Sequence, residues 1–234
     1  MQPDRTGSLS TSQSRAVDVG LRAHMNSIYN RMAVGVLITA IVAFGVSSSE
    51  EALRAIFGTP LKWVVMLAPL AVVMFGFNPN KMTSNQMRLS FGVLSVLYGL
   101  SFGAIFAVFN LGDIARAFFV TAGGFAGLSI YGYTTRKDLS GMGNFMVMGI
   151  IGALILSLIN IFVASSMLTN IVAVVSLVAF AGLTAYQTQQ MKEMYHSSYG
   201  PEANSRMGWM AALNLYVSFI AMFQTVLHFM SSQR

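Results

Sequence analysis

The sequence predicts an all-α integral membrane protein, a bundle of seven transmembrane helices with a cytoplasmic N-terminus and a periplasmic C-terminus. Three observations lead to this prediction. The composition is 55% hydrophobic and only 9% charged, the chain contains seven long apolar segments, and its Lys and Arg residues gather in alternate connections between those segments.

The composition excludes several classes of protein. Soluble domains carry about 25% charged residues, so a soluble fold with 9% would expose large apolar patches to water. The chain has no cysteine, which excludes disulfides, cysteine zinc sites and thiol nucleophiles. Its net charge of +6 includes no run of Lys or Arg, so we expect a topology signal and no nucleic-acid surface.

The apolar segments are long enough to cross a bilayer core about 30 Å thick, which takes roughly 20 helical residues. Membrane strands are a poor alternative, because short segments of alternating hydrophobicity are absent. The predicted spans are 32–49, 61–77, 89–109, 114–133, 142–164, 167–191 and 209–230. Residues 1–20 are polar with scattered charges, and we expect a disordered tail there, followed by a membrane domain over residues 21–234.

The basic residues indicate which connections face the cytoplasm. With the N-terminus inside, ten of the 14 Lys and Arg residues lie in the inner segments, among them Arg136 and Lys137. Inner connections of membrane proteins carry such an excess. We therefore expect the tail and the loops 134–141 and 192–208 to be cytoplasmic, and the seventh span then places the C-terminus outside.

Neutral polar side chains lie inside the sixth and seventh predicted spans. No Asp or Glu lies inside any span, which argues against a proton-coupled pump, because intramembrane carboxylates usually mark proton or cation pathways. Thr184, Gln187 and Gln190 share one helix face, while Asn214 and Ser218 are one turn apart. These groups either make ordinary hydrogen bonds between helices or form a polar seam that lines a cavity.

Two glycines in the span 114–133 are spaced for helix packing. Gly123 and Gly127 form a GxxxG pair, a spacing that lets two membrane helices approach closely. We expect them to contact a neighbouring helix and not to form a ligand-binding loop.

Catalytic and cofactor motifs are absent from the sequence, which contains no HExxH, GxSxG or Walker pattern. A serine hydrolase would need an oriented histidine inside the bundle, and His228 is the only histidine in the predicted spans. Its place near the outer end favours an interfacial side chain. We therefore expect no enzymatic activity, no cofactor and no dedicated metal site.

Three stretches carry a resemblance to a known family. They are GLSIYGYTTRKDLSGMGNF at 127–145, GLTAYQTQQMKEM at 182–194 and LNLYVSFIAMF at 213–223. With them the chain resembles the bacterial branch of the Bax inhibitor-1/YccA family, also called the TMBIM family, over about residues 21–230. The resemblance implies a seven-helix fold with a cytoplasmic N-terminus, in agreement with the charge distribution.

The resemblance also implies a passive calcium leak gated by pH through two aspartates, one in helix 6 and one in helix 7. The helix-6 motif resembles AYDTQ, and this chain has AYQTQ, so Gln187 stands at the aspartate position. The helix-7 motif resembles LYLDFI, and this chain has LYVSFI, so Ser218 stands at the other. The family's arginine near the inner end of helix 2 has no clear match, and Lys81 is the nearest basic candidate.

The missing carboxylates change the expected function. Gln and Ser do not titrate, and calcium prefers charged oxygen ligands, so we expect a calcium or ion leak with weak or absent pH gating in the bacterial inner membrane. We also expect Gln187 and Ser218 to approach each other across their helices. The alternative is an interaction protein that modulates a membrane-anchored protease or another membrane protein, with the polar tail as the segment that such a partner grips.

Overall fold

The computed structural model describes residues 5–195 and 199–231, with side chains described from Val19 onward. All regular secondary structure in these residues is helical, which confirms the predicted class. The helices are α1 (Arg5–Ser47), α2 (Glu50–Phe57), α3 (Leu61–Phe75), α4 (Ser84–Val108), α5 (Leu111–Thr134), α6 (Ser140–Val163), α7 (Ser166–Met194) and α8 (Pro201–Ser231).

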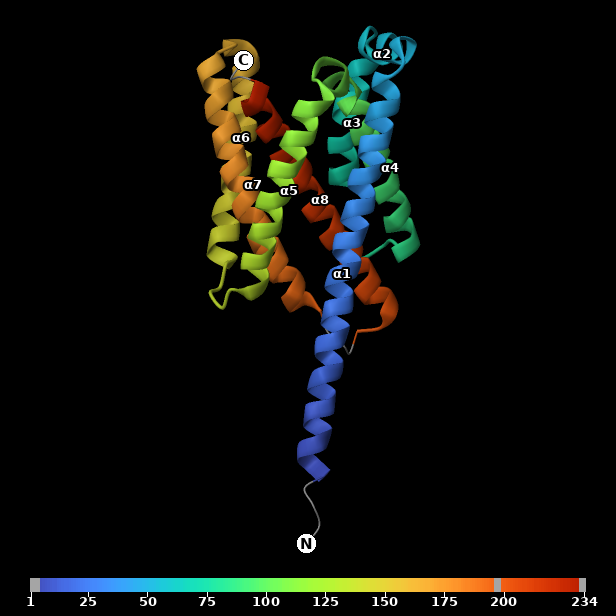
Figure 1. Cartoon of the computed structure of the whole chain (residues 1–234), viewed down its shortest axis with the longest axis vertical. Helices are drawn as coiled ribbons and strands as arrows, with labels where there is room; N and C mark the ends of the chain where they lie inside the picture. Colours follow the sequence, from blue (N-terminus) through green and yellow to red (C-terminus); the bar gives the residue numbers. More distant parts are fainter. Residues whose placement is uncertain (1–4, 196–198, 232–234) are drawn as a thin grey trace.

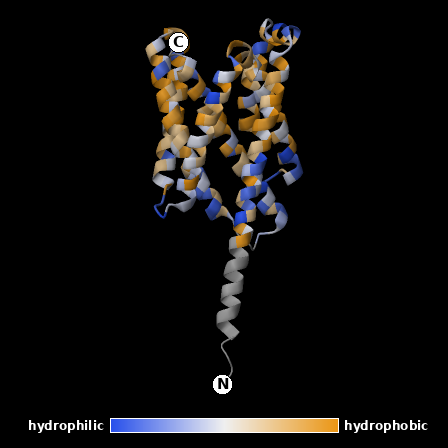
Figure 2. Ribbon diagram, in the orientation of Figure 1, coloured by the Kyte–Doolittle hydropathy of each residue, from blue (hydrophilic) through white to orange (hydrophobic). Residues whose placement is uncertain are grey.

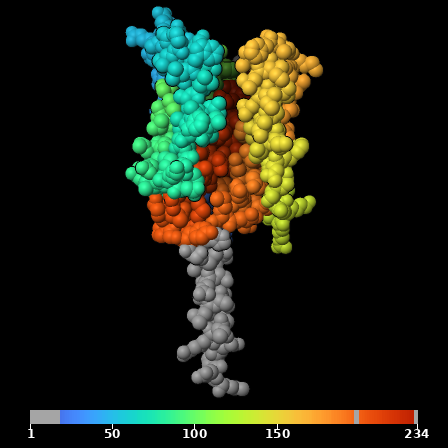
Figure 3. Space-filling view, turned by 180° about the vertical axis from the view of Figure 1, so that it is seen from behind, coloured from blue at the N-terminus to red at the C-terminus, as the bar shows by residue number. Residues whose placement is uncertain are grey.

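Helix α8 is the centre of the bundle. It packs against α1, α4, α5 and α7, and its buried residues extend from Gly208 to Leu227. Figure 3 shows part of α8 in the space between α3 and α4 on one side and α6 and α7 on the other. Helix α8 is therefore the interior helix of the bundle, whereas α6 packs mainly against α7 and leaves most of its surface to lipid.

Within the residues that the structure describes, six helices are long and apolar enough to cross a membrane: α1 from Val19 onward, α4, α5, α6, α7 and α8. Helices α2 and α3 pass the same test only together, and they bend by 80° at the break between them. Helix α3 alone has 15 residues, about 22 Å at 1.5 Å per residue, which is shorter than a bilayer core of about 30 Å. The predicted spans therefore correspond to six membrane helices and one broken pair.

The ends of the bundle differ in polarity. Helix α1 begins beyond one end of the bundle, and α8 finishes at the opposite end (Figure 1). The connection between α5 and α6 lies at the end from which α1 projects, whereas the turn between α6 and α7 lies at the other (Figure 1). Hydrophilic residues gather at the first of these ends, below the apolar middle of the helices (Figure 2).

The N-terminal segment differs from the sequence prediction. Residues 1–20 are predicted to be a disordered tail, but α1 begins at Arg5 and continues without a break into the membrane; residues 1–4 lie outside the described residues. The buried side chains of Met25 and Ile28 anchor α1 to the bundle. Once a helix is anchored, each further residue adds one hydrogen bond without a new nucleation step, which accounts for its extension toward the N-terminus.

The turn between α6 and α7 is as short as predicted, one residue earlier in the chain. It consists of Ala164 and Ser165, where Ser165–Ser166 was predicted, and Ala164 adopts a left-handed conformation with φ of 51°. The Asn160 side chain accepts from the Ser165 amide at 2.9 Å and donates to Thr169 Oγ1 at 2.7 Å. These bonds satisfy backbone and side-chain groups that a membrane would leave without water.

The predicted packing role of Gly123 and Gly127 is wrong. A methyl group at either position would meet no atom within 4 Å. Close helix contacts occur instead at Gly99, which lies against α1, and at Gly132, whose Cα lies against the backbone of Ala185 in α7. The GxxxG spacing defines a small-residue stripe on one helix, but it does not determine whether another helix lies opposite.

We predict that Gly99→Ala destabilises the fold by about 1–3 kcal/mol, the range for an overpacked core. The added methyl group would lie 2.6 Å from Val42 Cβ and 2.9 Å from the carbonyl oxygen of Thr39. Gly123→Ala is the matched control and should be neutral or slightly stabilising, since alanine is the better helix former. Unfolding in mixed micelles, followed by circular dichroism, measures both; equal stabilities would contradict the assigned α1–α4 contact.

Candidate functional site

A cavity of about 320 Å³, lined by both polar and apolar side chains, opens between α7, α8 and the connection before α4. We call it the vestibule. Its lining includes Asn80, Gln187, Gln190, Met207, Met210 and Asn214. The α7 and α8 residues in this lining come from the halves of those helices nearest the end from which α1 projects, so the vestibule is a recess at that end.

A hydrogen bond closes the inner side of the vestibule. The Ser218 hydroxyl of α8 donates to the Gln187 side-chain oxygen of α7 at 3.1 Å. Gln187 is 9% exposed and Ser218 is 1% exposed, so the bond lies at the boundary between the vestibule and the core. The predicted approach of Gln187 and Ser218 across these two helices is confirmed.

The other predicted seam residues take different positions. Gln190 lines the vestibule and donates to the Tyr186 hydroxyl at 3.2 Å, and Asn214 is an exposed member of the same lining. Thr184 lies one turn deeper, where it donates to the Phe180 carbonyl at 2.8 Å and packs against the Met222 sulfur at 3.8 Å. Beyond the Gln187–Ser218 bond, the Thr184–Met222 contact joins α7 to α8, and near the opposite end of the bundle His228 Nε2 lies 3.4 Å from Asn170 Oδ1.

Lys81 is not placed to act as the basic partner of the seam. Its side chain is exposed, and it does not line the vestibule. The basic residue that reaches this region is Arg206 of α8, which donates from Nη1 to the Pro79 carbonyl at 3.1 Å. The Arg206 Nε is buried without a hydrogen-bond partner. Sequence analysis missed Arg206, since nothing in the chain pattern brings the start of α8 against residue 79.

Two further polar contacts hold α8 and α7 in place. The hydroxyls of Tyr216 and Thr39 lie 2.6 Å apart, and Thr39 also contacts the Ser95 carbonyl at 2.9 Å, so one cluster joins α8, α1 and α4. On the α7 side, the hydroxyls of Tyr29 and Thr188 lie 3.3 Å apart. Thr39 and Ser95 are single polar side chains in apolar runs, and no periodicity of the sequence connects either pair.

Gln189, next to the predicted seam residues, has a different task. Its side-chain oxygen accepts from the Leu139 amide at 2.8 Å, and its side-chain nitrogen donates to the Lys137 carbonyl at 2.8 Å. These bonds fasten the connection between α5 and α6 to α7. Both glutamines next to Thr188 therefore make hydrogen bonds: Gln189 bonds to the α5–α6 connection, and Gln187 bonds to Ser218.

Acidic groups near the same end of the bundle lie outside the seam. Asp138 is exposed in the connection between α5 and α6, where the Ser140 side chain and backbone amide hold its pKa below the usual value. It is therefore ionised throughout the neutral range. Among the residues that the structure describes, no group of three or more His, Cys, Asp or Glu side chains converges on a point.

The family profile described as "Inhibitor of apoptosis-promoting Bax1" matches residues 21–234. The chain belongs to the Bax inhibitor-1 family. The match covers all the described membrane helices, with the exception of the first residues of α1, and it confirms the resemblance inferred from the three sequence stretches.

Bacterial members of the Bax inhibitor-1 family are similar over nearly their whole length. An uncharacterised protein of Rickettsia prowazekii is 35% identical over 225 residues, covering 96% of this chain and 95% of that protein. The inner membrane protein YbhL of Escherichia coli is 34% identical over 219 residues, covering 92% and 94%. Together with the apolar helices, this relationship confirms the predicted multi-pass protein of the inner membrane.

We predict a measurable coupling between Gln187 and Ser218. In a double-mutant cycle with Gln187→Ala and Ser218→Ala, the coupling free energy should be about 0.6 kcal/mol, the average for hydrogen bonds between membrane helices. The control cycle pairs Ser218→Ala with Gln190→Ala, because Gln190 bonds to Tyr186 of its own helix. Unfolding in mixed micelles gives the values; equal couplings in both cycles would refute the assigned bond.

Proposed function

We propose that this Bax inhibitor-1 family member is a non-enzymatic protein that provides a slow leak path for ions, calcium among them, between α7 and α8. The observation that carries the proposal is the Gln187–Ser218 hydrogen bond at the inner side of the vestibule. By resemblance, these two positions hold the gating aspartates of the family. The Gln187–Ser218 bond therefore joins the two positions of the family's gate, and it is made by an amide and a hydroxyl, which do not titrate.

The chemistry of the seam favours weak ion binding. Calcium takes six to eight oxygen ligands and prefers carboxylates, whereas the vestibule offers amide oxygens from Asn80, Gln187, Gln190 and Asn214. A neutral site does not hold a divalent cation strongly, and the buried hydrogen bond from the Thr184 hydroxyl to the Met222 sulfur lies beyond it. We therefore propose a low calcium permeability and little response to pH.

We further propose a seven-span topology in which the broken α2–α3 pair counts as one span. The N-terminus is then cytoplasmic and the C-terminus periplasmic, in keeping with the opposite ends at which α1 begins and α8 finishes (Figure 1). The proposal is supported by the ten of 14 basic residues that fall in the inner segments. It places the mouth of the vestibule on the cytoplasmic side.

The topology is tested by cysteine labelling, since the natural chain has no cysteine. A cysteine at Arg136, in the connection between α5 and α6, should react with a membrane-impermeant reagent only after the cells are permeabilised. A cysteine at Arg54, in α2, is the control that should react from outside in intact cells. The reverse pattern would show that the orientation is inverted.

We predict that calcium flux into liposomes containing the purified protein varies little between about pH 6 and 8. The double variant Gln187→Asp and Ser218→Asp should become pH-dependent, because two carboxylates in one low-dielectric seam cannot both ionise cheaply and one holds its proton into the neutral range. Raising the pH removes that proton, and the resulting repulsion separates α7 from α8. Flux should therefore rise with pH in the double variant.

Two results would contradict this proposal. The first is a steep pH response of the natural protein that persists in His228→Ala. His228 is the only histidine in the predicted spans, so such a response would come from a group that this proposal does not include. The second is a folded double aspartate variant with a flat response. The control variant Gln190→Asp and Asn214→Asp places two carboxylates in the vestibule lining outside the bond, and it should leave the gate insensitive to pH.

A second candidate function is an interaction protein that modulates a membrane-anchored protease or another membrane protein. The observation that favours it is the projection of α1 beyond the other helices (Figure 1). Deletion of residues 1–20 distinguishes the two candidates. A leak through the α7–α8 seam survives the deletion, whereas a function that depends on a partner held by this segment is lost.

A further inference from the structure

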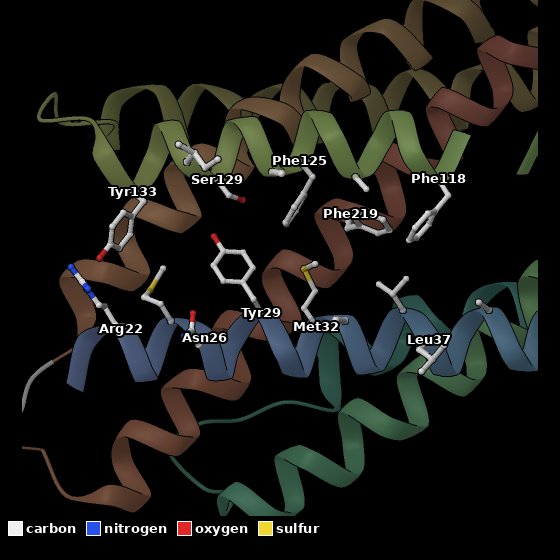
Figure 4. Close-up of a pocket in the computed structure, with 17 residues that line it drawn as sticks. Arg22, Asn26, Tyr29, Met32, Leu37, Phe118, Phe125, Ser129, Tyr133 and Phe219 are labelled. Carbon is white, nitrogen blue, oxygen red and sulfur yellow. The ribbon is translucent and has the colours of Figure 1, made fainter. Parts of the chain in front are cut away.

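A second cavity, unrelated to the vestibule, separates α1 from α5. It has a volume of about 840 Å³, its walls come from α1 and α5, and Phe219 of α8 forms part of its floor. We call it the α1–α5 groove. Figure 4 shows side chains from both helices pointing into it, with Arg22 and Tyr133 at one end and Leu37 and Phe118 toward the other.

The α1–α5 groove has a polar end and an apolar body. Arg22, Asn26, Tyr29 and Ser129 contribute polar groups near the end from which α1 projects, whereas the rest of the lining is dominated by Met, Ala, Val, Leu and Phe. Beyond the polar groups, from Tyr29 to Ala40, the groove follows α1 for 11 residues, about 16 Å. This length matches the hydrocarbon depth of one leaflet, about 15 Å, so the apolar body is long enough for an acyl chain.

The polar end of the α1–α5 groove carries two positively charged side chains, Arg22 and Lys192. The Arg22 side chain is exposed and makes no hydrogen bond or ion pair within the part of the chain that the structure describes. Lys192 lies next to the same end, where its Nζ donates to the Tyr133 carbonyl at 3.2 Å and sits 5.3 Å from the Tyr133 ring centre. Two cations thus flank the mouth of a groove whose body is apolar.

Ser129 provides an independent observation. It lines the groove and is only 7% exposed, yet its hydroxyl has no hydrogen-bond partner. Leaving a buried hydroxyl without a partner is unfavourable, because the group has lost its water and gained no other hydrogen bond. In Figure 4 its oxygen points toward the space between the two helices. An acceptor on a molecule in the groove, such as a glycerol ester carbonyl, would satisfy it.

We propose that the α1–α5 groove binds one anionic phospholipid from the leaflet at the Arg22 end. Its phosphate pairs with Arg22 beside Lys192, its ester region lies near Asn26 and Ser129, and one acyl chain occupies the apolar body between α1 and α5. The charge of the rim and the polarity gradient along the groove both match this ligand. The site is separate from the Gln187–Ser218 seam, so it holds whether or not the protein conducts ions.

The test measures lipid retention by the full-length protein. Native mass spectrometry of protein in detergent, titrated with phosphatidylglycerol or with zwitterionic phosphatidylcholine, should show one phosphatidylglycerol bound in preference. Arg22→Gln should weaken phosphatidylglycerol binding about tenfold, the loss expected for one charge-assisted contact, and it should leave phosphatidylcholine binding unchanged. Arg136→Gln removes a charge from the same end outside the groove and is the matched control.

A second variant tests the apolar body. Ala126→Phe fills the groove from α5 and should abolish retention of the bound lipid, whereas Val120→Phe, on a lipid-exposed position of α5 outside the groove lining, should not. Equal retention of the two lipids by the natural protein would overturn the proposal. So would an unchanged phosphatidylglycerol affinity in folded Arg22→Gln, or a protein dimer that binds no lipid at all.

Discussion

The structure depends on the burial of α8 among four other helices, and in a membrane the hydrophobic effect does not drive this burial. Inside a bilayer the lipid chains are as apolar as the side chains, so helix association depends on close packing and on a few polar contacts. Two of the polar contacts of α8 lie in its buried middle part. The hydroxyls of Tyr216 and Thr39, 2.6 Å apart, join it to α1, and the bond from Ser218 to Gln187 at 3.1 Å joins it to α7.

These two contacts lie on opposite faces of α8 and give it different neighbours. On the Tyr216 side the cluster with Thr39 and Ser95 is fully buried, and Gly99 lets α4 approach α1 closely. On the Ser218 side the contact borders the vestibule, which Gln187 lines. The proposed separation of α7 from α8 therefore begins at this contact, while the α1–α4–α8 unit stays intact.

Much of the fold was predictable, because hydropathy and length identify membrane helices well. The spans 114–133 and 142–164 agree closely with α5 and α6. The sequence did not reveal the 80° break before α3, which follows from Gly58 and Pro60 between two apolar runs. Nor did it reveal the extension of α1 to Arg5, because a polar composition alone does not stop a helix already anchored by buried residues.

The candidate site was predictable only for residues whose positions along their helices can be derived from the sequence. Gln187 and Ser218 could be paired from the family motifs and from helix depth, since both lie on neighbouring antiparallel helices. Arg206, Gln189 and Thr39 were missed, because their partners are backbone carbonyls or distant hydroxyls that no periodicity connects. The predicted packing role of Gly123 was wrong for the same reason. The sequence shows which residues share a helix face, but it does not show which helix, if any, packs against that face.

We propose that a neutral contact keeps α7 and α8 together whatever the pH. The most direct measurement is the distance between spin labels on cysteines introduced at two exposed positions, Glu193 of α7 and Asn85 of α4, the helix that packs against α8. Double electron–electron resonance in nanodiscs should give the same single distance distribution at pH 6 and at pH 8. A second, longer population that grows between these pH values would contradict the account.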